Sequence, residues 1–233
     1  MKSAALFDLG NTLVAYYERA EFPAVLAESI GEAKACLARR GSLSVADDVI
    51  GRRVAQEDYE AEDFRVRPLE GRLSRIFGLN ESAEPGDLVA DLCRCFLRPV
   101  FARAQVYGDS VPALQALRGR GLKTAVVSNT PWGSPADLWR EELERLGLAE
   151  HLDAAVFCRD AGWRKPDRRI FERALRVLGV AADEALFVGD DPRWDSVGAA
   201  AAGMDAVLID RGGTMRREKA IHSLQELWEV LSL

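Results

Sequence analysis

The sequence predicts an α/β protein with a doubly wound parallel sheet and an inserted all-helical domain. Three observations lead to this prediction. Short apolar runs recur along the 233 residues, helical patterns separate the later runs, and one long interval holds helical patterns without a convincing strand run. Strands that alternate with helices are typical of a parallel sheet with functional residues at the carboxyl ends of its strands.

Five short apolar runs are interpreted as buried parallel strands. They are 4–7, 124–128, 154–157, 185–189 and 206–209. Between the later runs, apolar residues recur at three- and four-residue spacing, which predicts helices. The predicted helices are 134–147, 167–179 and 195–203. The first two end at a glycine, as helices commonly do.

The interval from Val14 to Ala104 breaks this alternation. Its predicted helices are 24–40, 44–62 and 87–103, separated by prolines and glycines. At roughly 150 residues per domain, the length allows one core and a substantial insertion. We therefore expect an α/β core of residues 1–14 and 105–233, and a helical domain of residues 15–104.

The amino-acid composition argues against some classes of binding partner. A formal net charge of −6 argues against general attraction to nucleic acid or to an anionic membrane. No apolar stretch reaches the ~18 residues of a membrane span, and the N-terminal MKSAALFDLG meets an Asp too early for a signal peptide. Four scattered cysteines do not form a disulfide framework and are expected to be reduced. We expect a cytoplasmic protein.

Polar residues follow the predicted strands. The first strand runs into Asp8, with Gly10 two residues later. The second ends at Ser128 and Asn129, whose hydroxyl and amide could bind the oxygens of an anion. Each feature alone also fits an ordinary strand end or polar turn. The carboxyl ends of parallel strands lie at the edge where open α/β sheets bind ligands, so the two sites together favour a functional role.

Two further clusters carry charge. Lys165 precedes a proline at the start of a predicted helix and is one of five lysines among 31 basic residues. Asp190, Asp191 and Asp195 follow the strand 185–189, and such carboxylates repel one another unless a cation offsets them. A surface lysine and a solvated acidic loop are the alternatives. The apolar strand that ends at Gly189 favours burial, and therefore a hard metal ion.

Taken in order, the four clusters resemble the motifs of the haloacid dehalogenase superfamily of hydrolases. The resemblance covers about residues 1–14 and 105–215, and the stretch from Gly189 through Asp195 to Gly203 is especially similar to the last motif of the family. It implies a Rossmann-like parallel sheet core, and the helical insertion falls where the family places its cap. The expected architecture is thus a doubly wound core with an inserted all-α cap domain.

The resemblance implies a role for each position in the chemistry of phosphate transfer. Asp8 matches the nucleophile that takes up a phosphoryl group as an aspartyl phosphate. Ser128, with Asn129 beside it, matches the phosphate-binding site. Lys165 matches the lysine that steadies the charge between nucleophile and phosphate.

The same resemblance implies a Mg²⁺ site. Its ligands would be Asp8, the backbone carbonyl of Gly10, and Asp190, with Asp195 as a supporting carboxylate and Asp191 next to the ligand. A carboxylate and a phosphate monoester are both anionic, so attack is opposed unless Mg²⁺ and a lysine lower the local charge. The expected cofactor is therefore Mg²⁺, and the expected substrate is a small phosphorylated metabolite.

Gly10 departs from the family pattern. Family phosphatases usually carry a second Asp at this position, which protonates the leaving oxygen and then activates water. Without it, general acid–base help of about 10²–10⁴-fold is missing unless another group supplies it. Asp191 and carboxylates of the insertion are candidates for that group. We expect slow turnover, a preference for good leaving groups, or a different reaction.

Three functions stay open, of which a Mg²⁺-dependent phosphatase is favoured. Dehalogenases of the family need no metal, so Asp190 argues against them. Phosphonoacetaldehyde hydrolases use a cap lysine, and the insertion offers Lys34 alone, within an ordinary helical stretch. A catalytically weak binding module is the third possibility. The joint presence of Asp8, Ser128, Lys165 and Asp190 argues against it, because folding does not require four such groups.

Substrate choice is expected to depend on the insertion, which can close over the site. Tyr16, Tyr17, Arg65 and Arg67 are candidate contacts, although core aromatics and a solvated helix face are the favoured interpretations. Arg65 and Arg67 could prefer a second anionic group on the substrate, but arginine is abundant throughout the chain. Trp132 follows the turn at Ser128 and could pack on a substrate or on the cap, although packing of its loop on its own helix is favoured. Neither the substrate nor the oligomeric state is indicated.

Overall fold

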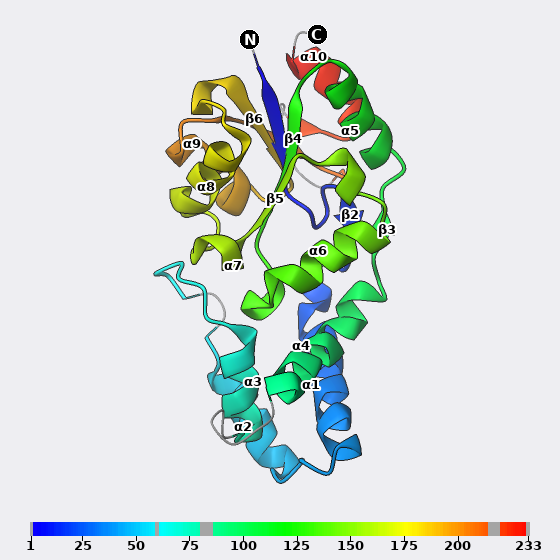
Figure 1. Cartoon of the computed structure of the whole chain (residues 1–233), viewed down its shortest axis with the longest axis vertical. Helices are drawn as coiled ribbons and strands as arrows, with labels where there is room; N and C mark the ends of the chain where they lie inside the picture. Colours follow the sequence, from blue (N-terminus) through cyan, green and yellow to red (C-terminus); the bar gives the residue numbers. More distant parts are fainter. Residues whose placement is uncertain (1, 59–60, 80–85, 214–219, 232–233) are drawn as a thin grey trace.

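A six-stranded sheet forms the core of the protein (Figure 1). The computed structural model describes residues 2–58, 61–79, 86–213 and 220–231. The strand order is β5-β4-β1-β6-β7-β8, and every neighbouring pair is parallel. The strands are β1 (Ala4–Phe7), β4 (Lys123–Ser128), β5 (Ala154–Phe157), β6 (Ala185–Gly189), β7 (Asp205–Ile209) and β8 (Ala220–Ile221). The predicted parallel α/β core is confirmed.

β1 lies at the centre of this order, between β4 and β6. Later strands are added on both sides of it, so the direction of winding reverses at β1. In open α/β sheets, ligands bind outside the carboxyl ends of the strands at this reversal. The five predicted strands all form, with bounds that shift by at most one residue. β8 was not predicted, because two residues do not make a recognisable apolar run.

Helices cover both faces of the sheet. α8 (Arg168–Leu178) and α9 (Val197–Ala201) share a buried cluster with alternate strand residues such as Leu6 and Phe187. Phe7 and Val188 face the other way, into the cluster that includes residues of α5 (Ser110–Gly119) and α10 (Leu227–Leu231). Side chains alternate across a strand, so wholly apolar strands fit a sheet buried on both sides. Within the described segments, no helix combines the length and apolarity needed to cross a bilayer.

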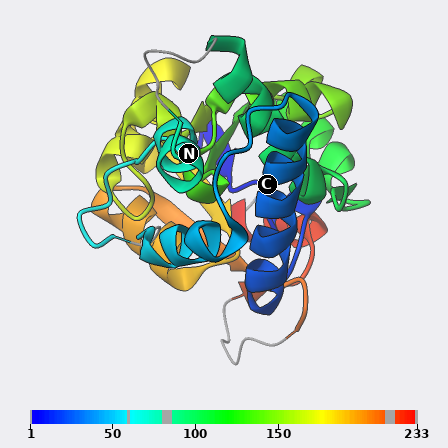
Figure 2. The same ribbon diagram turned by 90° about the horizontal axis from the view of Figure 1, so that it is seen from below.

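Four α-helices lie between β1 and α5 along the described chain and form a helical lobe beyond the carboxyl ends of the strands (Figure 1). They are α1 (Phe22–Arg39), α2 (Asp47–Gln56), α3 (Leu69–Phe77) and α4 (Gly86–Phe101). Seen from below, α1 and the helices of the 47–77 region lie in front of the core (Figure 2). The helical character predicted for this interval is thus observed.

One helix of the lobe is shorter than predicted and another was missed. The helix expected over 44–62 ends at Gln56, and residues 59–60 lie outside the described segments. Glu57 has an extended backbone at this end of the helix, and its carboxylate binds Arg72 at 2.9 Å and Arg75 at 2.9 Å, both on α3. α3 was not predicted, because its nine residues lie between the breaks at Pro68 and Gly78.

The chain leaves the core for the lobe and returns to it at one place. β2 (Val14–Ala15) pairs antiparallel with β3 (Gln105–Val106), so the chain leaves and re-enters the core side by side. Two-residue strands of this kind leave no signal in a sequence pattern. The division of the chain at 14/15 and 104/105 remains a prediction, and the paired segments lie at these two positions.

Two glycines in helices differ in the space around them, and this difference predicts opposite effects of alanine. At Gly198 in α9, an added Cβ would lie 2.5 Å from the Phe171 ring and 2.9 Å from the Pro166 carbonyl oxygen. At Gly31 in α1, nothing lies within 4 Å. Gly198→Ala should lower the free energy of unfolding by about 1–3 kcal/mol through overpacking. Gly31→Ala should raise it by about 0.5–1 kcal/mol.

Chemical denaturation of both variants beside the parent chain measures the two free energies. A Gly198→Ala variant as stable as the parent would contradict the close packing of α9 on α8.

Candidate functional site

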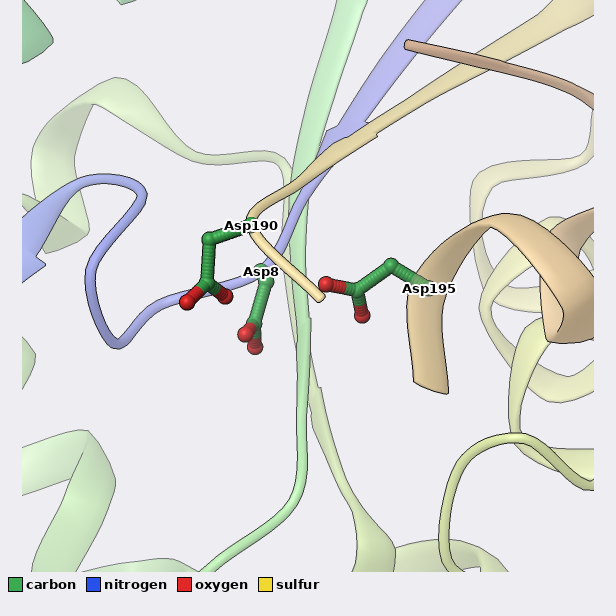
Figure 3. A group of neighbouring side chains, drawn as sticks. All are labelled: Asp8, Asp190 and Asp195. Atoms are coloured by element: carbon green, nitrogen blue, oxygen red, sulfur yellow. The ribbon is translucent and has the colours of Figure 1, made fainter. Parts of the chain in front are cut away.

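Asp8 and Asp190 lie side by side at the tips of two neighbouring strands (Figure 3). Asp8 follows β1, and its backbone N–H donates to the carbonyl oxygen of Val188 in β6 at 2.9 Å. The sheet pairing therefore extends to Asp8 and fixes its backbone. β6 ends at Gly189, so Asp190 leaves the adjacent strand at the same edge. The sequence prediction that these residues converge agrees with the structure.

A π-helical turn, Pro192–Ser196, brings Asp195 back toward the strand tips. Asp191 caps this turn, because its carboxylate accepts from the backbone N–H groups of Arg193 at 2.8 Å and Trp194 at 3.1 Å. Asp195 then approaches so closely that a Cβ at Gly189 would lie 2.2 Å from its carboxylate. Glycine at 189 is therefore required by the approach of Asp195.

Three carboxylates meet at this edge of the sheet. Asp8, Asp190 and Asp195 each offer one oxygen, and these oxygens lie within 4.8 Å of one another. Figure 3 shows Asp195 facing the other two from the side of its helical turn. Burial, with repulsion from Asp8 and Asp195, raises the pKa of Asp190 to about 8. Burial also raises the pKa of Asp195 to about 6, although Lys165 opposes this. The cluster thus lacks positive charge.

Lys165 supplies part of that charge. Its Nζ lies 2.7 Å from an oxygen of Asp8 and 2.7 Å from an oxygen of Asp195, and the residue is 1% exposed. Burial opposes the charge on Lys165, but the two carboxylates outweigh this effect and hold its pKa above the usual value. The second oxygen of Asp195 accepts from the Asp191 N–H at 3.0 Å. Both oxygens of Asp195 are therefore engaged by the protein.

Asp190 differs from Asp195 in this respect. Across the described parts of the chain, no hydrogen bond or ion pair reaches the Asp190 carboxylate. Asp8 likewise meets Lys165 through one oxygen only. Hard divalent cations take carboxylate and carbonyl oxygens as ligands. The donor set of Asp8, Asp190 and the nearby Gly10 backbone fits such a cation, and the raised pKa of Asp190 shows the missing charge.

Asn129 holds the backbone of Lys165. Its side-chain oxygen accepts from the Lys165 N–H at 2.8 Å, and its side-chain nitrogen donates to the Lys165 carbonyl at 3.3 Å. Ser128 ends β4, and its hydroxyl donates to the Asn129 carbonyl oxygen at 3.2 Å. The structure therefore brings both residues next to Lys165. Their assignment to phosphate binding remains a prediction, and the contacts of Asn129 give it a positioning role that the sequence did not indicate.

A cavity of about 520 Å³ opens in front of the carboxylates. Asp8, Ser128, Lys165 and the loops that follow β4 and β6 line its core side, and residues of the lobe and of the segment that leads into it line the rest. Cavities of this size are typical of small-molecule sites. The predicted site residues of the core, apart from Asp195, thus line one space.

Several cavity residues were candidate substrate contacts from the sequence, although packing or surface roles were favoured for them. Tyr16, Tyr17, Arg65 and Arg67 all line the cavity. Arg72 also lines it and was missed, because it lies on α3, which the sequence did not reveal.

Trp132 connects its loop to the lobe. Its ring stacks on Phe96 of α4, with centroids 5.6 Å apart, and the guanidinium of Arg72 lies 5.5 Å from the ring centroid. The ring therefore packs on the lobe, a contact that the sequence left open for it. The sequence carries no signal for the particular residues that meet there.

Backbone hydrogen bonds also join the lobe to the core. The Val66 N–H donates to the Gly162 carbonyl at 3.1 Å, and the Arg164 N–H donates to the Phe64 carbonyl at 2.8 Å. Near these bonds, Arg159 binds Glu70 of α3 at 2.9 Å. The lobe is therefore held over the cavity from the side that carries Lys165.

Comparisons with known proteins agree with this geometry. The sequence model of the haloacid dehalogenase-like hydrolases matches residues 2–203. Ribulose-1,5-bisphosphate 5-phosphatase of Halopiger xanaduensis is 30% identical over 100% of this chain and 99% of its own length. Phosphoserine phosphatase of Thermus thermophilus is 39% identical over 65% of this chain, a match that spans only 57% of that relative. A solved 2-haloacid dehalogenase of Pseudomonas syringae pv. Tomato is 25% identical, with a TM-score of 0.72 over 100% of this chain and 99% of its own.

The carboxylate cluster predicts a pH-dependent stability when divalent cations are removed. Unfolded Asp190 has an ordinary pKa of about 4, whereas burial and its neighbours raise the folded value to about 8. Between these values the folded state holds a proton that the unfolded state has lost, so the free energy of unfolding falls as pH rises from about 4 to about 8. Denaturation in a chelator at pH 6 and pH 8 measures this fall.

Asp190→Asn is the matched control for this measurement. It removes the titrating group and should reduce the fall, and added Mg²⁺ should stabilise the parent chain more at pH 8 than at pH 6. Identical pH profiles for parent and variant would show that Asp190 does not carry the unbalanced charge.

Proposed function

The chain belongs to the haloacid dehalogenase-like hydrolases, and we propose that it is a Mg²⁺-dependent phosphatase that hydrolyses a small phosphorylated metabolite through an aspartyl phosphate. The observation that carries the proposal is the Lys165 ammonium 2.7 Å from Asp8, beside the carboxylate of Asp190. This arrangement offers a nucleophile together with the means to offset the charge of a phosphate. Relatives named as phosphatases support the same reaction.

In this proposal, the reaction starts at Asp8. Its carboxylate attacks phosphorus, the bond from phosphorus to the ester oxygen breaks, and the phosphoryl group is carried on Asp8. Lys165, held by Asp195 and Asn129, offsets the negative charge that gathers between carboxylate and phosphate. The Ser128 hydroxyl binds a phosphate oxygen. Water then hydrolyses the aspartyl phosphate and restores the Asp8 carboxylate.

The metal would be held by Asp8, Asp190 and the carbonyl oxygen of Gly10. When bound, Mg²⁺ lowers the repulsion between the anionic nucleophile and the anionic substrate. The lobe serves as the cap in this proposal: it excludes water from the cavity and contacts the organic part of the substrate.

Because Gly10 has no side chain, the proposed enzyme lacks the usual group that protonates the leaving oxygen. Asp191 lines the cavity but uses one oxygen to cap the turn at Arg193. Tyr16 also lines the cavity, and burial raises the pKa of its phenol, which makes it a poor acid. Neither group is placed as a full replacement for the missing Asp. The proposed enzyme therefore works best on esters whose leaving oxygen needs little protonation.

The first test is a panel of phosphorylated metabolites with 4-nitrophenyl phosphate, assayed with and without Mg²⁺. We expect phosphate release that depends on Mg²⁺ and falls by at least about 10³-fold in Asp8→Asn, because that change removes the nucleophile. Unfolding curves of the variant control for folding. Phosphate release that survives Asp8→Asn, or the absence of release from every ester, would falsify the proposal. Halide release from a 2-haloacid without metal would instead indicate a dehalogenase.

The second test restores a carboxyl group at position 10. An added Cβ at Gly10 would have the Tyr16 ring at 3.9 Å, an ordinary contact, and Gly10 is not among the glycines with positive φ. Gly10→Asp should therefore fold, and it should raise the turnover of alkyl phosphates by about 10²-fold. 4-Nitrophenyl phosphate should gain less, since its leaving group needs no proton. Equal rates for alkyl and aryl esters in the parent chain, with no gain in the variant, would mean that another residue already transfers the proton.

A further inference from the structure

We propose that Arg65 binds a second anionic group of the substrate, so that the preferred phosphate monoesters carry an additional carboxylate or phosphate. The inference rests on the proposed function, which places the reacting phosphate at Asp8, Ser128 and Lys165. It goes further because it names the class of substrate and the residue that selects it.

The arginines around the cavity differ in how many of their guanidinium N–H groups already donate hydrogen bonds within the protein. Arg67 binds Asp63 through both terminal nitrogens, at 3.0 and 3.1 Å. Arg72 binds Glu57 at 2.9 Å and the Asp58 carbonyl at 2.8 Å. These contacts leave the two guanidinium groups committed to the lobe itself.

Arg65 is different. Over the described stretches of the chain, its guanidinium makes no hydrogen bond and no ion pair, although the residue lines the cavity and its charge acts on the nearby Asp63. Its charge is held instead over the indole of Trp163, with the guanidinium carbon 4.8 Å from the ring centroid. A cation that lies on an aromatic face keeps the N–H groups at its edge available.

The backbone of Arg65 is fixed on both sides. Its own N–H donates to the Asp63 carboxylate at 3.1 Å. The neighbouring Phe64 and Val66 make the backbone hydrogen bonds to Arg164 and Gly162. Arg65 also forms a bridge-type pairing with Trp163. A guanidinium held in this way loses less entropy on binding, and its planar fork matches a carboxylate or phosphate with two hydrogen bonds.

The cavity has room for such a substrate. Its volume of about 520 Å³ exceeds what a phosphate group needs. The metal-binding carboxylates and Lys165 come from the core, whereas Arg65 comes from the segment between α2 and α3. A substrate with one anion at each end would therefore contact both core and lobe, which gives the lobe a means to select it.

Arg169, which also lies on the ring of Trp163, provides a matched control for Arg65. The guanidinium carbon of Arg169 lies 3.1 Å from the ring centroid. Arg169 is paired with Asp167 and does not line the cavity. If Arg65 merely packs on Trp163, then Arg65→Gln and Arg169→Gln should have similar effects. If Arg65 binds substrate, only Arg65→Gln should change substrate preference.

The experiment compares esters that differ by one charged group. O-phosphoserine is paired with O-phosphoethanolamine for a carboxylate, and a diol bisphosphate is paired with its monophosphate for a phosphate. The parent chain should favour at least one doubly anionic member by about tenfold or more in kcat/KM. Arg65→Gln should raise KM for that member by about 10–100-fold, with kcat nearly unchanged, and should alter the single-anion member by less than about threefold. Arg169→Gln should leave both members within about threefold of the parent.

The outcomes separate the inference from the proposed function. Asp8-dependent hydrolysis of 4-nitrophenyl phosphate without any preference for doubly anionic esters would overturn the role of Arg65 alone. Equal losses for both members of a pair, or equal effects of Arg65→Gln and Arg169→Gln, would also overturn it. No phosphate release from any ester would overturn both proposals.

Discussion

The site depends on one buried ammonium group shared by two carboxylates. Lys165 lies 2.7 Å from Asp8 and 2.7 Å from Asp195, and these three residues come from three separate segments of the chain. Leaving any of these charges unpaired in the interior would be costly, so each segment constrains the others. Asn129 fixes the Lys165 backbone, and Gly189 leaves room for Asp195. Much of the local geometry therefore follows from the need to keep this ammonium paired.

The same interaction leaves a defined imbalance of charge. Asp8 and Asp195 share Lys165, whereas Asp190 stands beside them without a hydrogen bond or ion pair from the described residues. A protein that needed only stability would have no reason to keep a third carboxylate there. The proposed metal ion would neutralise the excess negative charge of the carboxylates. The phosphate of a substrate would then bind beside a surface that is no longer strongly anionic. An unpaired carboxylate at Asp190 therefore lowers the stability of the fold, whereas the proposed reaction needs that carboxylate to bind the metal.

The sequence predicted the parts of the site that topology determines. Parallel strands that wind away from β1 must bring their carboxyl ends to one edge, so Asp8, Ser128 and Asp190 could be placed together from their positions after apolar runs. Contacts between distant segments could not be predicted. Trp132 stacks on Phe96 and Arg65 lies on Trp163 only because the lobe packs at one particular angle. The division of labour between Asp191 and Asp195 depends on a π-helical turn, for which an acidic run carries no signal.

The two backbone hydrogen bonds between residues 64–66 and 162–164 end one residue before Lys165. Any movement that parts these segments must break them, and the chain that carries the ammonium then loses its outer support. Within the core, Asn129 still holds the Lys165 backbone, and Asp8 and Asp195 still pair with its ammonium. The contact between lobe and core thus ends directly beside the residue that pairs with Asp8, so in the proposed reaction a change in the position of the lobe would act next to the ammonium group.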